Sequence, residues 1–178
     1  MILSGSAIAQ AVFDGDIVID PFVPAQVGPN SYDFRLGNRC KTYISRELDV
    51  SLRNEVTEQP LPEDGLLLLP GTLYLINTME VMGSFKYVPI IRGRSSTGRL
   101  GLFINVTADL IDLGSINQWT LQLSPVLPVR VLPGMLIGQV TFWTTKGIPQ
   151  FYSGKYRDLS SPVESHSYRD FEKVVPHA

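Results

Sequence analysis

Residues 88–106 read VPIIRGRSSTGRLGLFINV, and this segment gives the clearest indication of the fold. Its two ends, Val88–Ile91 and Leu102–Val106, are short and rich in residues that favour β-strands. Between them lies a polar segment of glycine, serine and arginine. Because glycine and serine are typical of turns, the stretch predicts two strands joined by a polar loop.

The same pattern continues on both sides of this stretch. Further short segments rich in β-formers are Ile17–Ile19, Tyr32–Leu36, Leu73–Ile76, Trp119–Leu123 and Val140–Trp143. Thirteen prolines and fifteen glycines punctuate the chain, and no later segment sustains a long helical period. The sequence therefore predicts a mainly β fold, either a sandwich, a jelly roll or a distorted barrel, with short helices.

A helix is predicted near the start of the chain. Ser4 or Ser6 can cap it, it runs through Phe13, and Gly15 ends it. A chain of 178 residues suits one domain, so we expect a single domain over residues 1–178.

Two polar segments are expected to lie outside the core of this domain. Arg46–Asp64 is charged and contains prolines, which predicts an exposed excursion. Residues 153–178 form a polar tail with aromatic anchors, and such a tail either frays or closes over something.

Composition excludes several classes of protein. Fifteen basic and seventeen acidic side chains give a net charge of −2, which offers no basic face for duplex nucleic acid. Cys40 is the single cysteine, so neither an intrachain disulfide nor a thiolate zinc cage is expected. Met1–Ser6 lacks the pattern of a signal peptide, and the apolar run Leu66–Leu69 is too short to span a membrane. We therefore expect a cytoplasmic protein.

The polar segment Arg92–Arg99 has the chemistry of an anion site. A glycine permits close approach, and Ser95 or Ser96 can cap a short helix whose free N–H groups face outward. Arg94 and Arg99 add forked donors that suit phosphate oxygens. The alternative is a surface turn with solvated arginines. The segment is not a P-loop, because it lacks the lysine that reaches the phosphates and the Ser/Thr that holds magnesium.

Two acidic residues follow this segment. Asp112 lies two positions before the turn residue Gly114, with Asp109 just upstream. An aspartate in this place could hold a sugar hydroxyl or orient a water molecule. The alternative is an aspartate that only serves the turn.

Taken together, these segments resemble the dCTP deaminase family, a trimeric branch of the dUTPase superfamily. The resemblance runs nearly end to end and is strongest at Gly93–Leu102. The matching segments are Met1–Ser4, Gly28–Gly37, Gly93–Leu102, Ala108 with Ile111–Gly114, Pro133–Gln139 and Tyr152–Tyr156.

The resemblance implies a dUTPase-like distorted jelly roll or β-barrel, assembled as a homotrimer with active sites between subunits. It also implies a deoxynucleoside triphosphate as ligand, magnesium held only through the triphosphate, and residues 153–178 as a lid. Family deamination uses no zinc; a glutamate activates water for attack on C4 of cytosine and passes the proton to the departing ammonia.

The resemblance further implies roles for individual residues. The phosphate-binding turn, which also fixes the reacting water, would be Arg94, Ser95, Ser96, Thr97, Gly98 and Arg99. The base would lie along the strand Thr120–Gln122, namely Thr120, Leu121 and Gln122, and Ala108 would also contact the nucleotide. Asp112 would hold the deoxyribose 3′-hydroxyl. Gln139, Tyr152 and Lys155 would complete the triphosphate pocket. The catalytic positions would be Ser95, Arg99, Asp112 and Gln122.

The chain departs from the family pattern on the base side of the site. Gln122 occupies the position of the catalytic glutamate, and an amide cannot accept and return a proton near neutral pH. General acid–base catalysis typically contributes roughly 10²–10⁴-fold in rate, and this contribution is expected to be missing. Further departures are Leu110, Ser115, Asn117 and Leu159.

Three functions therefore remain open. The first is a dCTP deaminase that releases ammonia and dUTP. The second is a dUTPase-like diphosphatase, in which Asp112 and a magnesium-bound triphosphate position water for attack on phosphorus. The third is a non-catalytic nucleotide-binding trimer.

Overall fold

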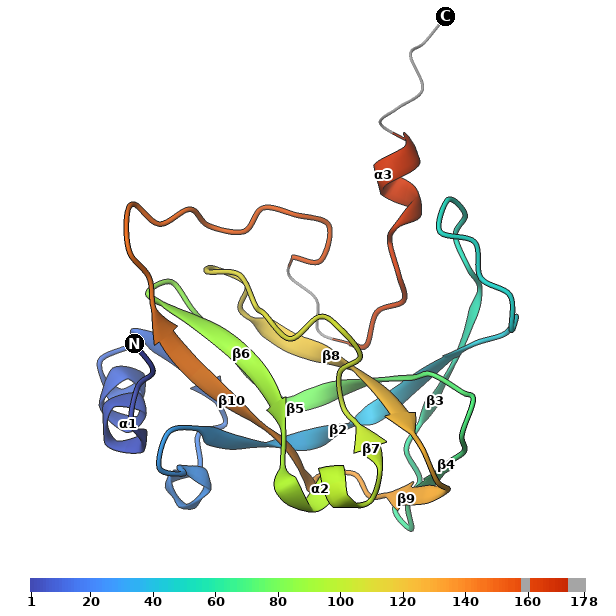
Figure 1. Cartoon of the computed structure of the whole chain (residues 1–178), viewed down its shortest axis with the longest axis horizontal. Coiled ribbons are helices and arrows are strands. Elements are labelled where there is room, and N and C mark those ends of the chain that lie inside the picture. Colours follow the sequence, from blue (N-terminus) through green and yellow to red (C-terminus); the bar gives the residue numbers. More distant parts are fainter. Residues whose placement is uncertain (158–160, 173–178) are drawn as a thin grey trace, which may run out of the picture.

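An eight-stranded antiparallel sheet dominates the structure (Figure 1), a computed structural model that describes residues 1–157 and 161–172. The strands of this sheet are β1 (Ile17–Asp20), β2 (Tyr32–Tyr43), β3 (Val56–Pro60), β5 (Tyr74–Ser84), β6 (Tyr87–Gly93), β7 (Leu102–Phe103), β8 (Asn117–Pro125) and β10 (Leu136–Thr144). A separate two-stranded ribbon joins β4 (Leu66–Leu68) to β9 (Val129–Val131). The prediction of a mainly β fold is confirmed.

The sheet is nearly closed into a barrel. Its strand order is β6-β10-β2-β5-β8-β7, with β1 added on β5 and β3 added on β2. The free edge of β6 pairs with the segment that leads into β8, because Ile91 N donates to Asp109 O at 2.8 Å and Ile111 N donates to Pro89 O at 3.0 Å. The expected distorted barrel is therefore confirmed, and its seam lies between β6 and β8.

Alternation of side chains along β8 separates the core from the opposite face of the sheet. Trp119, Leu121 and Leu123 are buried in the hydrophobic core. Thr120 and Gln122 point to the other face and are only partly buried. Because successive residues of a strand point to opposite sides, this register determines which β8 side chains are free for a ligand.

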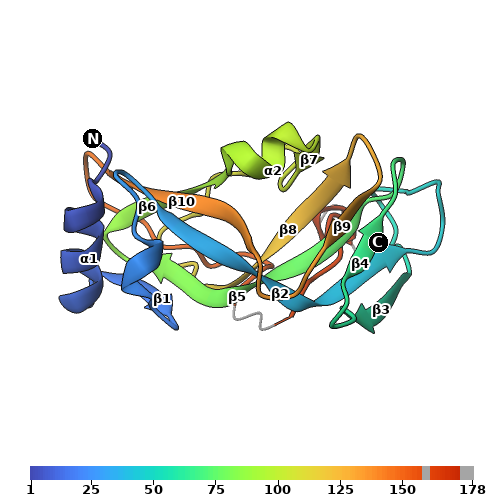
Figure 2. The same ribbon diagram turned by 90° about the horizontal axis from the view of Figure 1, so that it is seen from below.

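Short helices lie at the margins of the sheet, and Figure 2 shows α1 (Gly5–Phe13) at the end opposite to β3 and β4. The predicted N-terminal helix is confirmed, with Ser4 Oγ accepting a hydrogen bond from Ala7 N at 3.4 Å. The remaining helices are η1 (Pro24–Gln26), α2 (Ser95–Arg99) and α3 (Tyr168–Glu172). Each helix among the described residues is too short or too polar to cross a membrane.

The prediction that Ser95 or Ser96 caps α2 is wrong. The N-cap is Arg94, and its side chain makes no capping hydrogen bond. The hydroxyl that closes this turn belongs to Thr97, whose Oγ1 donates to Arg94 O at 2.9 Å and to Ile137 O at 3.3 Å. Both serines are exposed, and neither hydroxyl makes a hydrogen bond within residues 1–157 and 161–172.

The predicted excursion Arg46–Asp64 is exposed along most of its length, but it contains a strand. Strand β3 has hardly any buried side chain, so its sequence shows no alternation of apolar and polar residues. Its backbone nevertheless pairs with β2 from Arg39↔Pro60 to Tyr43↔Val56. This strand is held by backbone pairing with β2 and not by burial of its side chains. A search for alternating apolar and polar residues therefore could not reveal it.

Candidate functional site

A cavity of about 400 Å³ opens beside β8 and is the principal candidate for a ligand site. Its walls come from the exposed face of β8, from residues 108–111 at the barrel seam, and from the tail around residues 163–165. Thr120 and Gln122, which the resemblance assigned to the base, and Ala108, which it assigned to the nucleotide, all line it. We refer to it below as the β8 cavity.

The side chain of Gln122 is held in place inside this cavity. Its Oε1 accepts a hydrogen bond from Val106 N at 3.4 Å, and its Nε2 donates to Thr120 O at 3.2 Å. The Thr120 hydroxyl accepts from Val163 N at 3.0 Å, which fastens the tail over the strand. Leu121 lies between them with its side chain fully buried in the core, so this residue can meet a ligand only through its backbone.

Most of the departures from the family pattern meet in the β8 cavity. Leu110, Ser115 and Asn117 line it together with Gln122. Asn117 Nδ2 donates to Ser115 Oγ at 3.2 Å, so these two substituted positions contact each other. Leu159 falls outside the described residues. Four of the five positions at which the sequence was expected to depart from the family therefore line one pocket.

The tail adds a carboxylate that the sequence did not reveal as a site residue. Of the described residues that line the β8 cavity, Glu164 alone carries a carboxylate, and the residue is only 7% exposed. Its Oε2 accepts a hydrogen bond from Lys41 Nζ at 2.9 Å, and its Oε1 lies 3.5 Å from Arg53 Nη2. Burial raises the pKa of Glu164, but the hydrogen bond from Lys41 and its charge help to hold the pKa below its usual value. The carboxylate is therefore ionised at neutral pH.

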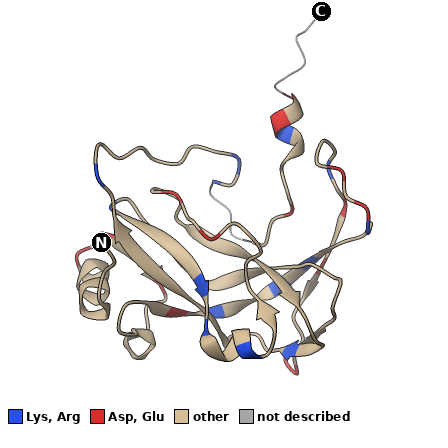
Figure 3. Ribbon diagram, viewed as in Figure 1, with Lys and Arg blue, Asp and Glu red and all other residues tan. Residues whose placement is uncertain are grey.

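The arginine–serine turn at α2 lies outside the lining of this cavity. Arg94 is tied down, because its Nε lies 3.0 Å from Asp33 Oδ2 and its Nη1 donates to Leu136 O at 3.4 Å. Arg99 is exposed and has no ion-pair partner among residues 1–157 and 161–172. Basic segments of the ribbon gather around α2 and the strand ends beside it (Figure 3). This local positive charge, with the free serine hydroxyls, keeps α2 a candidate anion site.

Two other predicted phosphate contacts have their polar groups engaged within the chain. The hydroxyl of Thr97 is used for the backbone bonds at α2, and the residue is only 3% exposed. Gln139 Oε1 accepts from Ser31 Oγ at 2.8 Å, and its Nε2 donates to Gly93 O at 3.0 Å. A phosphate could reach Thr97 only through its backbone N–H. Gln139 fixes the base of the turn by holding Gly93.

Tyr152 and Lys155 lie with the tail and are separate from α2. Tyr152 N donates to Leu113 O at 2.8 Å, which places the tail against the turn that follows Asp112. Lys155 forms an ion pair with Asp170, and this contact raises the pKa of the lysine. Asp112 is exposed, and its backbone carbonyl accepts from Ser115 N at 3.1 Å.

One chain thus brings together only part of the predicted site. Ala108, Thr120 and Gln122 share the β8 cavity, whereas residues 94–99 at α2 contribute nothing to its lining. The sequence reasoning missed Lys41 and Glu164, which are separated by 123 positions and carry no local motif. Within the described ranges, no group of three or more His, Cys, Asp or Glu side chains could hold a metal ion.

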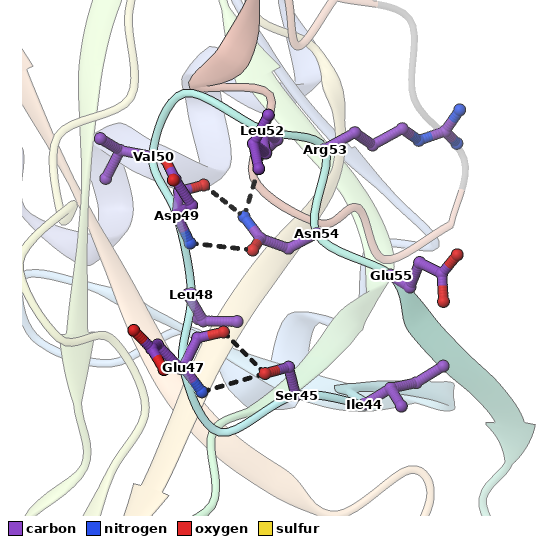
Figure 4. A pocket seen from close by; sticks show the side chains of 10 residues that line it. All are labelled: Ile44, Ser45, Glu47, Leu48, Asp49, Val50, Leu52, Arg53, Asn54 and Glu55. Carbon is purple, nitrogen blue, oxygen red and sulfur yellow. Dashed lines mark hydrogen bonds between the residues drawn. The ribbon is translucent and has the colours of Figure 1, made fainter.

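A second hollow is formed within the loop between β2 and β3 (Figure 4). Asp49 and Asn54 hold the loop together, with Asp49 N donating to Asn54 Oδ1 at 3.0 Å and Asn54 Nδ2 donating to Asp49 O at 2.8 Å. Arg53 extends outward from this loop, and its guanidinium reaches Glu164 in the tail. The loop therefore helps to hold the tail over the β8 cavity.

Comparison with known proteins places this geometry in a family. The family model described as dCTP deaminase-like matches residues 2–145. The chain is 44% identical over 174 residues to the "dCTP deaminase, dUMP-forming" of Clostridium botulinum (strain Eklund 17B / Type B), covering 97% of this chain and 100% of the relative. It is 44% identical over 171 residues to the "dCTP deaminase" of Rhodopirellula baltica, covering 96% of this chain and 86% of the relative.

A solved structure agrees at the level of the fold. The crystal structure of 2′-deoxycytidine 5′-triphosphate deaminase from Agrobacterium tumefaciens superposes with a TM-score of 0.65 at 24% identity. The match covers 81% of this chain and 48% of that chain. With the family match over residues 2–145 and the identity to full-length relatives, the chain belongs to the dCTP deaminase-like family.

Proposed function

We propose that this chain binds a deoxynucleoside triphosphate of the dCTP class, with the base in the β8 cavity. One observation carries the proposal: Thr120 and Gln122, which the resemblance assigns to the base, line one cavity together with Ala108, which it assigns to the nucleotide. The cavity volume of about 400 Å³ falls within the range typical of small-molecule sites. Asp112, at the turn beside the tail, would hold the 3′-hydroxyl of the sugar.

The triphosphate would bind to α2 of a neighbouring copy in a homotrimer. This part of the proposal is supported by the separation of α2 from the β8 cavity within one chain, because a combined site then needs a second chain. Exposed apolar side chains also gather near α2 and its neighbouring turn, as expected for a contact between copies. They are Leu100, Phe103, Val126 and Leu127.

Magnesium would be held through the phosphate oxygens. The donor set at α2 fits this arrangement, because Arg94, Arg99 and the two exposed serines offer groups that bind phosphate. When bound, Mg²⁺ neutralises part of the triphosphate charge. Lys155 and Tyr152 would approach the phosphates from the tail, and residues 153–178 would act as the lid.

The reaction expected from the names of the relatives is deamination of dCTP. In this chain the position of the proton-transferring glutamate holds Gln122, whose amide is already hydrogen-bonded to the backbone of Val106 and Thr120. We therefore propose that nucleotide binding persists while deamination is slower than with a glutamate, by roughly 10²–10⁴-fold.

Release of pyrophosphate is the second candidate reaction. Relatives are named "dUMP-forming", and conversion of dCTP to dUMP requires loss of two phosphates as well as the amino group. That hydrolysis depends on placement and charge neutralisation, so it does not need a glutamate at position 122. A trimer that binds nucleotide without turnover is the remaining alternative.

One set of measurements separates these functions. Purified protein with Mg²⁺ and a panel of nucleoside triphosphates is assayed for ammonia, for pyrophosphate and for a shift in melting temperature. Ammonia from dCTP identifies a deaminase, pyrophosphate without ammonia identifies a diphosphatase, and a melting shift alone identifies a binding protein. No melting shift and no product with any nucleotide would refute the proposal.

A matched pair of variants tests the position of Gln122. Gln122→Glu is expected to raise the rate of ammonia release from dCTP. Gln59→Glu adds the same charge on the exposed strand β3 and is expected to leave the rate unchanged. An unchanged rate in Gln122→Glu would mean that other substitutions in the cavity, such as Leu110, also prevent placement of the base.

A further inference from the structure

Strand register places Lys41 on the same row of the sheet as Gln122, the position that the resemblance assigns to the catalytic glutamate. Lys41 on β2 lies opposite Leu75 on β5, and Leu75 lies opposite Gln122 on β8. Directly opposite residues in an antiparallel sheet point to the same face. Leu75 and Gln122 both line the β8 cavity. Lys41 therefore stands on the same face, at the end of the row that begins with Gln122.

The tail sets Glu164 over this row. On one side Val163 N donates to Thr120 Oγ1 at 3.0 Å, and on the other side Ser165 N donates to Tyr43 OH at 2.9 Å. These two backbone bonds hold the residues on each side of Glu164 to β8 and to β2. The carboxylate then reaches Lys41 Nζ at 2.9 Å, and Glu164 is left only 7% exposed.

The ion pair leaves the carboxylate with free acceptor capacity. Two carboxylate oxygens can accept about four hydrogen bonds. Lys41 Nζ and the backbone N–H of Glu164 itself use two of them. Arg53 lies farther away at 3.5 Å, and its side chain is 72% exposed. A ligand that enters the cavity can therefore still donate a hydrogen bond to Glu164.

The side chains of Gln122 and Glu164 differ in which hydrogen-bonding groups of a base they can recognise. A primary amide such as that of Gln122 carries both a donor and an acceptor, so rotation lets it pair with either type of base edge. An ionised carboxylate accepts only. Cytosine presents an amino group at C4, which donates, and uracil presents a carbonyl at C4, which accepts. A buried carboxylate that faces C4 therefore pairs with the amino group of cytosine and repels the carbonyl of uracil.

We propose that Glu164, positioned by Lys41, is the residue that selects an amino-bearing pyrimidine over a carbonyl-bearing one in the β8 cavity. The inference rests on the proposed function, since it requires that the cavity receive a nucleotide base. It assigns to the tail a part in choosing the ligand as well as covering it.

The test is calorimetric titration of the full chain with Mg²⁺–dCTP and with Mg²⁺–dUTP. The unsubstituted protein is expected to bind dCTP more tightly by about 10- to 100-fold, the range for one hydrogen bond to a charged group. Glu164→Gln removes the charge at nearly constant volume and is expected to bring the two Kd values within about threefold of each other. Glu164→Asp keeps the charge and is expected to retain a preference for dCTP.

Glu58→Gln is the matched control. Glu58 lies on β3, outside the cavity, and its Oε2 is 3.9 Å from the same Lys41 Nζ. This variant changes the surroundings of Lys41 without touching the pocket, so the preference for dCTP is expected to survive.

The outcomes are distinguishable. Equal binding of dCTP and dUTP by the unsubstituted protein overturns the inference and leaves the proposed function intact. An equal loss of affinity for both nucleotides in Glu164→Gln also overturns it, because Glu164 then only holds the tail in place. Binding of neither nucleotide by the unsubstituted protein overturns the proposed function as well.

Discussion

Replacing Glu80 by glutamine should destabilise the whole fold, because this carboxylate is fully buried in β5. Its Oε1 accepts from Arg35 Nε at 2.7 Å and from Gln26 Nε2 at 3.5 Å, and its Oε2 accepts from Arg35 N at 2.9 Å. Arg35 Nη2 is itself buried with no hydrogen-bond partner. Removal of the charge would leave the guanidinium of Arg35, whose side chain is only 22% exposed, without its counterion.

The expected loss is about 3–5 kcal/mol in the free energy of unfolding, the cost of breaking a buried ion pair from one side. For a chain of this length, each kcal/mol lowers the melting temperature by about 2–4 °C. The measurement is urea unfolding of both proteins at the same protein concentration, because the stability of an associating protein depends on that concentration.

An exposed ion pair provides the control for this prediction. Arg39 Nη1 and Glu58 Oε1 are 2.5 Å apart, but the two side chains are 59% and 33% exposed. Glu58→Gln is therefore expected to cost no more than about 1 kcal/mol. A loss below about 1 kcal/mol in Glu80→Gln as well would refute the argument that burial sets the cost of breaking these pairs.

Further predictions concern the anion site, the single thiol and the packing under α2. Arg99→Ala should weaken the binding of every nucleoside triphosphate by a similar factor of about 10- to 100-fold. Weaker binding of nucleotides with one base only would contradict a phosphate role for Arg99. Burial raises the pKa of the Cys40 thiol to about 12. The neutral thiol therefore stabilises the fold below its ordinary pKa of 9.0, and this contribution is lost as the pH rises toward 12. A thiol reagent at pH 8 should modify Cys40 only on unfolding. Gly138→Ala would place a Cβ 2.4 Å from Phe34 Cζ and 2.5 Å from Ile104 Cδ1. This overpacking should lower the free energy of unfolding, measured in urea, by about 1–3 kcal/mol. An unchanged free energy of unfolding would show that this packing can relax.

Several features of this protein follow from local sequence alone. The β-rich class follows from short runs of β-formers separated by glycine and proline, and the N-terminal helix follows from Ser4 and the residues after it. The glycine, serine and arginine turn at residues 93–99 identified the candidate anion site and carried the resemblance to the family. These features act over a few neighbouring residues, so a linear pattern is enough to find them.

Local sequence was less reliable where equivalent groups compete. Ser95, Ser96 and Thr97 all carry a hydroxyl at α2, and the sequence favoured the serines as caps. The structure uses Thr97 for the backbone bonds, because its side chain faces Ile137 in the adjoining strand. Which hydroxyl turns inward depends on packing between α2 and β10, and that packing has no signature within the turn.

Local sequence could not reveal which residues meet at the β8 cavity. Lys41 and Glu164 meet across 123 positions because strand register brings Lys41 into line with Gln122 and the tail crosses back over β8. Neither residue lies in a motif, and a polar tail looks the same in sequence whether it is solvated or packed. Pairing register and the return of the tail are set by long-range contacts, and these determine which charge faces the β8 cavity.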